Sequence, residues 1–163
     1  MNNSNNPKDV HGEERTKVSR KMGLRDRRIG GKLSNEENDK IAAAAEAMIC
    51  KLFNKPYRRG STGPDGGYDF KLGNYTVDVK CIAPRKSGHL IKPPHQAYCG
   101  IYIVVGGADI ESLKVLGWET GDKLKHADMK DFGYGLQPAI HTSELRGINE
   151  LLRWRKCQHE NQD

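Results

Sequence analysis

The sequence predicts an α/β fold with a central mixed sheet of about four strands flanked by helices. Three observations indicate this class: an alanine-rich helical segment, an alternating hairpin directly after it, and later apolar runs of strand length. The 163 residues are enough for one globular domain with a real core. We expect the core elements in the order α-β-β-β-α-β, followed by a last helix.

The first element is a helix from about residue 34 to Phe53. Ser34 and Glu37 form a capping-box pattern at its start, and the alanines that follow favour helix. Four residues at helical spacing form its predicted apolar stripe: Ile41, Ala45, Met48 and Leu52.

A β-hairpin is predicted at about 68–82, with Gly73-Asn74 as its two-residue turn. Counting outward from this turn pairs Leu72 with Tyr75, Phe70 with Val77 and Asp69 with Asp78. Like charges placed directly opposite each other destabilise a sheet. A divalent cation held between the two aspartates would explain the arrangement.

The remaining elements follow from shorter patterns. A continuous apolar run at 100–105 predicts a strand buried on both faces, and 114–119 is a second strand. Ser143 is expected to cap the last amphipathic helix. We expect short helical turns at 109–113 and 122–127, and irregular segments at 54–67, 83–98 and 128–142.

Charge is concentrated at the N-terminus. Residues 1–34 carry nine basic and four acidic side chains, a net +5 of the chain's +6. We therefore expect a basic arm at 1–33 that raises affinity for nucleic acid, a folded domain at 34–157 and a short polar tail at 158–163. A solubilising tail is the alternative reading of the arm.

Location and cysteine chemistry are constrained by absences in the sequence. No run approaches the length of a membrane span and no apolar signal core is present, so we expect a cytoplasmic protein without a membrane partner. The four cysteines are scattered without a CxxC pair, which argues against a zinc site or a disulfide framework.

The hairpin carries residues suited to phosphodiester hydrolysis. Asp69 and Asp78 can each supply one oxygen to Mg²⁺, and the main-chain carbonyl of Val79 can supply a third. Lys80 lies on the same face as Asp78, two residues on, where it can orient or deprotonate the water or stabilise the transition state. The alternative is a solvent-facing hairpin with ordinary charges, since Asp-x-Lys alone is common.

This pattern resembles the PD-(D/E)XK nuclease superfamily, whose restriction-endonuclease-like fold places an aspartate before an acidic-x-lysine strand. Here the motif is Asp69 followed by Asp78-Val79-Lys80, and the chain looks similar to small phage or bacterial members. The resemblance implies Mg²⁺- or Mn²⁺-dependent cleavage of nucleic acid, usually DNA, and we favour an endonuclease over an exonuclease. It also implies a helix glutamate at the metal, for which Glu46 is the match. An ordinary solvated helix glutamate is the equal alternative.

Two further choices stay open at this level. Pro64-Asp65 also spells the first half of the motif, but the hairpin register favours Asp69, and Asp65 fits a turn-forming role. The candidate phosphate contacts flank the hairpin: Arg58, Arg59, Arg85, Lys86, His89 and Lys92. A nucleic-acid-binding module of the same fold without turnover is the alternative function. Oligomeric state, including a homodimer, is open.

Overall fold

The computed structural model describes residues 35–57, 67–82 and 88–160, and the chain divides into two compact units, 1–66 and 67–163. Of the first unit the structure describes one helix and the residues directly after it. This helix, α2 (Asn35–Leu52), confirms the predicted one, although Ser34 and the basic arm lie outside the described residues. Ile49 of the helix and Phe53 directly after it are buried, whereas Leu52, predicted to face inward, is 40% exposed.

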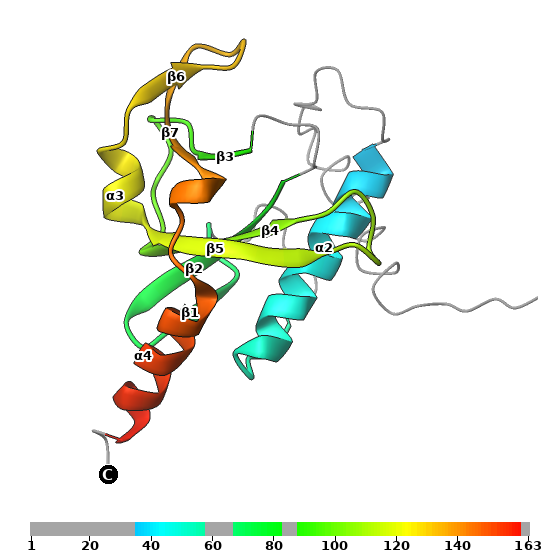
Figure 1. Ribbon diagram of the computed structural model, residues 1–163, viewed down its shortest axis with the longest axis vertical. Helices are drawn as coiled ribbons and strands as arrows, with labels where there is room; N and C mark the ends of the chain where they lie inside the picture. Colours follow the sequence, from blue (N-terminus) through cyan, green and yellow to red (C-terminus); the bar gives the residue numbers. More distant parts are fainter. Residues whose placement is uncertain (1–34, 58–66, 83–87, 161–163) are drawn as a thin grey trace, which may run out of the picture. The chain divides into compact units, whose positions relative to one another are not determined.

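The second unit contains a mixed four-stranded sheet in the order β1-β2-β4-β5 (Figure 1). Its strands are β1 (Phe70–Leu72), β2 (Tyr75–Ile82), β4 (Ile101–Gly106) and β5 (Lys114–Thr120). The inner strands β2 and β4 are parallel, and the two outer pairs are antiparallel. Every residue of β4 is buried, as its continuous apolar sequence predicts. The α/β class and the mixed four-stranded sheet are therefore confirmed.

The hairpin register is confirmed up to Phe70. Leu72 pairs with Tyr75 and Phe70 with Val77, around the predicted turn at Gly73. The predicted pairing of Asp69 with Asp78 is wrong, because the ladder ends at Phe70. The Asp69 N–H donates instead to the Val77 carbonyl at 2.8 Å, so the chain leaves the ladder one residue early.

A second sheet, which the sequence reading did not predict, lies in segments expected to be irregular. Its strands are β3 (His89–Ile91), β7 (Leu136–His141) and β6 (Met129–Asp131), in the order β3-β7-β6 and all antiparallel. Two features hide these strands from sequence patterns: two of them have only three residues, and β7 contains Pro138, which normally argues against a strand.

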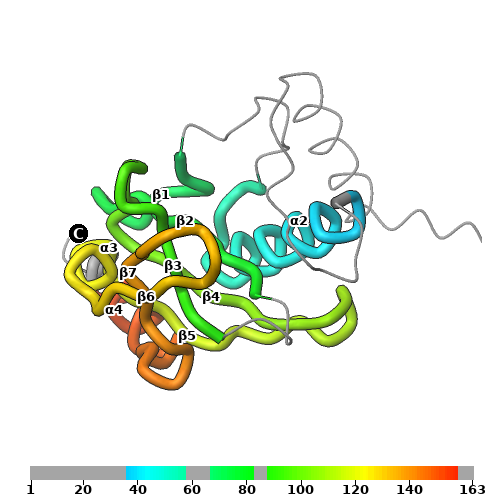
Figure 2. Tube along the Cα trace, turned by 90° about the horizontal axis from the view of Figure 1, so that it is seen from above, coloured from blue at the N-terminus to red at the C-terminus, as the bar shows by residue number. Residues whose placement is uncertain are grey.

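The second sheet packs on one face of the first (Figure 2). Leu90 of β3 and Ile140 of β7 form a buried cluster with Tyr102 and Val104 of β4. Leu124 of α3 (Gly121–Lys125) belongs to the same cluster. Because residues paired across a sheet share a face, this is the face of β2 that carries Asp78 and Lys80. The core between the two sheets therefore adjoins these two side chains.

The last helix, α4 (Ile148–Glu160), begins five residues after Ser143, the predicted cap. Ser143 lies instead in the 3-10 turn η1 (Thr142–Glu144), and the next residues are extended. Arg146 there exchanges two main-chain hydrogen bonds with Trp118 of β5, which delays the start of the helix. The segment 109–113 is likewise not a helix but a turn, closed by Ser112 and Asp109. No helix in the described ranges is long and apolar enough to cross a membrane.

Candidate active site

The Asp69 carboxylate lies against the edge of β2, where β1 has ended. Its Oδ2 accepts a hydrogen bond from the Val79 N–H at 2.7 Å, and the residue is 9% exposed. The N–H and carbonyl of one strand residue point to the same edge, so the Val79 carbonyl is directed to this side as well. Asp69, the first predicted metal ligand, therefore contacts β2 at Val79, the residue directly after Asp78, although Asp69 and Asp78 are not cross-strand partners.

Asp78 and Lys80 form an ion pair on the face of β2 beside the core. The Lys80 Nζ lies 2.6 Å from Asp78 Oδ2, and the two side chains are 38% and 13% exposed, respectively. Strand alternation directs both to the same face, as the sequence predicts. A carboxylate and an ammonium group thus meet at a half-buried position that solvent can reach.

The charge balance keeps Lys80 protonated. Burial by itself lowers the pKa of Lys80, but the charge of Asp78, a hydrogen bond to it and the charge of Asp69 outweigh burial, and the net pKa is raised. A protonated amine cannot accept a proton from water. Of the roles open to Lys80, orienting water and stabilising negative charge fit this state better than general-base catalysis.

Of the predicted phosphate contacts, the structure brings Lys92 to the site. Burial and the charge of Lys80 lower the pKa of Lys92, and Asp78 acts on it in the opposite direction. Lys92 therefore lies within electrostatic range of the ion pair. It directly follows β3, two residues after Leu90, which is buried in the core between the sheets.

His89 lies on the opposite face of β3. Its ring packs on His141, with centroids 4.9 Å apart, and on Phe132 at 5.1 Å. Its Nε2 lies 3.2 Å from the Lys130 Nζ, and because an ammonium group only donates, this ring nitrogen is the acceptor. His89 is therefore directed away from the face that carries Lys80.

The other predicted residues belong to the first unit or to undescribed segments. Glu46 lies on α2 in the first unit and is 6% exposed, so it is not an ordinary solvated helix glutamate. Its approach to a metal stays a prediction. Five predicted residues lie outside the described ranges: Arg58, Arg59, Asp65, Arg85 and Lys86.

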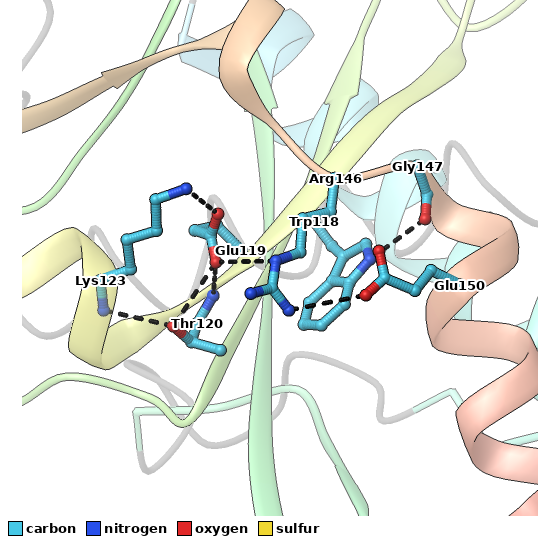
Figure 3. A network of polar contacts seen from close by, with 7 residues as sticks. All are labelled: Trp118, Glu119, Thr120, Lys123, Arg146, Gly147 and Glu150. Carbon is cyan, nitrogen blue, oxygen red and sulfur yellow. Dashed lines mark hydrogen bonds and ion pairs between the residues drawn. The ribbon is translucent and has the colours of Figure 1, made fainter.

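A second acidic residue, Glu119, lies in the same row of the sheet as Asp78. Asp78 pairs with Tyr102, and Tyr102 pairs with Glu119, so all three share one face. The fully buried Glu119 carboxylate contacts Lys123 Nζ at 2.9 Å and Arg146 Nε at 3.6 Å (Figure 3). Two cations neutralise it, so its role is to join β5 to α3 and to the segment before α4.

The contacts around Arg146 complete this network. Its guanidinium stacks over the Trp118 ring at 5.0 Å and lies 3.7 Å from Glu150 of α4 (Figure 3). The Trp118 indole N–H donates to the Gly147 carbonyl at 3.1 Å. Trp118 is buried, at 7% exposure. The network fixes the end of β5, and on the same face of the sheet it leaves Asp78 and Lys80 of β2 outside it.

The donor set at β2 fits Mg²⁺ in kind. Two carboxylates and one main-chain carbonyl are hard oxygen ligands, and Mg²⁺ usually combines one or two carboxylates with water and phosphate oxygens. Within the described ranges, no group of three or more His, Cys, Asp or Glu side chains is arranged to hold a metal ion. A metal here would rely on Asp69, Asp78 and the Val79 carbonyl.

Comparison with known proteins gives no match. No family model matches the chain, and no curated protein or solved structure is significantly similar to it. The resemblance to PD-(D/E)XK nucleases therefore depends on the motif residues and on the order of the elements, and the function of Asp69, Asp78 and Lys80 is a matter for proposal.

Proposed function

We propose that this protein is a Mg²⁺- or Mn²⁺-dependent endonuclease of the PD-(D/E)XK type that cleaves DNA. The observation that carries the proposal is the convergence at β2 of two carboxylates with a protonated lysine. The charges of Asp78 and Asp69 both raise the pKa of Lys80, and the Lys80 Nζ lies 2.6 Å from Asp78 Oδ2. The mixed sheet with parallel inner strands is consistent with this assignment.

Each residue has a defined role in this proposal. Asp69 and Asp78, with the Val79 carbonyl, hold the metal ion, which when bound supplies Lewis-acid polarisation of a phosphate oxygen. The Lys80 ammonium donates a hydrogen bond that orients the attacking water and offsets negative charge as it develops. Lys92, close to the same face, attracts a neighbouring phosphate. Glu46 assists the metal in the family pattern, and its part here stays a prediction.

The direct test is cleavage by the purified protein with Mg²⁺ on supercoiled plasmid, linear duplex and single strand in parallel. We expect nicking of the plasmid that chelator abolishes. Asp78→Asn and Lys80→Met should reduce the rate by at least about 100-fold, the scale of one lost catalytic group. Matched controls are Asp128→Asn and Lys125→Met, both at exposed positions of the same unit. Full activity in Asp78→Asn would exclude the proposal.

A non-catalytic nucleic-acid-binding module is the second candidate. The lack of a three-ligand metal cluster in the described ranges favours it. In that case nucleic acid binds without Mg²⁺, no substrate is cut, and Asp78→Asn leaves affinity unchanged or raises it. The slope of log affinity against log salt then measures how many phosphates are contacted.

A further inference from the structure

The turn that leads into β4 contacts both the segment that carries Asp69 and the strand β2 that carries Asp78. The Cys99 thiol donates a hydrogen bond to the Gly67 carbonyl at 2.8 Å, across 32 residues of sequence. Gly67 is two residues before Asp69, on the segment that carries this carboxylate to the edge of β2. Cys99 is 6% exposed whereas Gly67 is exposed, so the contact is buried on the side of the thiol.

The main chain around Cys99 is held on several sides. Its N–H donates to the hydroxyl of Tyr102 at 2.9 Å, and Tyr102 is fully buried and pairs with Asp78. The next N–H, of Gly100, donates to the Thr76 hydroxyl of β2 at 3.1 Å. Both anchors lie on the face that carries Asp78. The turn is therefore fixed to β2 and β4, while its thiol reaches the Asp69 segment.

Close packing on the other side restricts the turn further. The Gly100 carbonyl accepts from the Gly121 N–H at 2.9 Å, and a Cβ at Gly121 would lie 1.8 Å from the Cys99 carbonyl oxygen. The Cys99 thiol also lies within electrostatic range of Asp78, Lys92 and Lys80. A rigid donor thus lies between the two carboxylate-bearing segments.

We propose that Cys99 is a positioning residue that acts through the Gly67 carbonyl to hold the Asp69 carboxylate at the β2 edge beside Asp78. The thiol touches neither substrate nor metal in this role. Its importance for cleavage rests on the proposed nuclease function, but its effect on Asp69 does not. The inference can therefore be tested on the protein without substrate.

The test follows the Val79 amide, whose proton bonds to Asp69, by hydrogen exchange in NMR spectra. Cys99→Ala should speed exchange at Val79 about five- to tenfold relative to Ile103 in β4, the scale of one net hydrogen bond. Cys99→Ser retains a donor and should restore most of the protection. Tyr102→Phe removes the hydroxyl that accepts from the Cys99 N–H and should also speed exchange at Val79. It is the second variant if Cys99→Ala does not fold.

Leu124→Ala is the matched structural control, because Leu124 packs in the same core cluster as Cys99. It should speed exchange at Val79 and Ile103 equally. If Cys99→Ala leaves Val79 unchanged, or changes both amides equally as the control does, the positioning role is overturned.

Metal binding separates this inference from the nuclease proposal. We expect Cys99→Ala to weaken Mn²⁺ affinity and to lower kcat with little change in KM, with rescue by Cys99→Ser. If the wild-type protein neither binds Mn²⁺ nor cleaves DNA, the nuclease proposal fails, and exchange at Val79 still decides the role of Cys99.

Discussion

Replacing Asp69 separates its structural role from its catalytic one. In Asp69→Ala the buried Val79 N–H loses its acceptor, which costs about 1–3 kcal/mol of the free energy of unfolding. Asp69→Asn keeps an oxygen at the same place, and a neutral acceptor is about half as strong as a charged one. We therefore expect Asp69→Asn to cost less, by about 0.5–1.5 kcal/mol. Both variants should lose cleavage, since the amide is a poor Mg²⁺ ligand beside a carboxylate.

Urea unfolding followed by tryptophan fluorescence gives the two free energies, and cleavage of supercoiled plasmid gives the activities. At about 2–4 °C per kcal/mol for a chain of this size, thermal melts should rank the variants in the same order. Asp128→Ala and Asp128→Asn are the matched controls, because Asp128 is exposed. Both should stay within about 0.5 kcal/mol of the wild type.

Equal stability losses in Asp69→Ala and Asp69→Asn would refute the hydrogen bond as the source of the effect. Wild-type cleavage by Asp69→Asn would instead refute its role as a metal ligand and leave the structural role intact. The two conclusions are independent, because stability and cleavage are measured separately.

Three further predictions concern the rest of the second unit. Because the pKa of Lys80 is raised, its pairing with Asp78 should stabilise the fold fully below pH 10.5 and lose this effect as the pH rises through the higher folded pKa. The free energies of unfolding of wild type and Lys80→Met, measured in urea, should therefore converge only above pH 10.5. Gly121→Ala should cost about 1–3 kcal/mol or more, because its Cβ would overlap main-chain atoms, whereas Gly147→Ala meets nothing within 4 Å and should be close to neutral in thermal melts. Arg146→Lys keeps the charge but loses the planar stacking on the indole ring, so the free energy of unfolding in urea should fall by about 0.5–1 kcal/mol. The near-ultraviolet circular dichroism of tryptophan should also change, and an unaltered signal would count against the stacking.

Local patterns predicted the elements whose structure depends on neighbours in the sequence. The alanine-rich run forms α2, and the turn at Gly73 sets the register of Phe70 with Val77. Alternation alone placed Asp78 and Lys80 on one face. By contrast, β3, β6 and β7 are stabilised by pairing between distant segments, and their short sequences carry no signal of it.

The site was predicted only in part, because it too depends on contacts between segments that are distant in the sequence. The sequence predicts a hairpin ladder that extends to Asp69. The ladder ends one residue earlier, at Phe70, and the Asp69 carboxylate accepts a hydrogen bond from the Val79 N–H of β2 instead. His89 and Lys92 looked equivalent as loop residues, but His89 belongs to β3 and packs on His141, whereas Lys92 follows the strand within electrostatic range of Lys80. Tyr102 gave no functional signal, because it lies within a continuous apolar run whose pairing partners are distant.

The early end of β1 has a consequence for the solubility of the protein. Beyond Val77, the β1 side of β2 meets no other strand of the described ranges, and such open edges invite pairing with a second chain. The Asp69 carboxylate occupies the Val79 N–H and adds a negative charge at this edge, two features that discourage an incoming strand. The residue that would hold a metal ion therefore also protects the sheet against edge-to-edge aggregation.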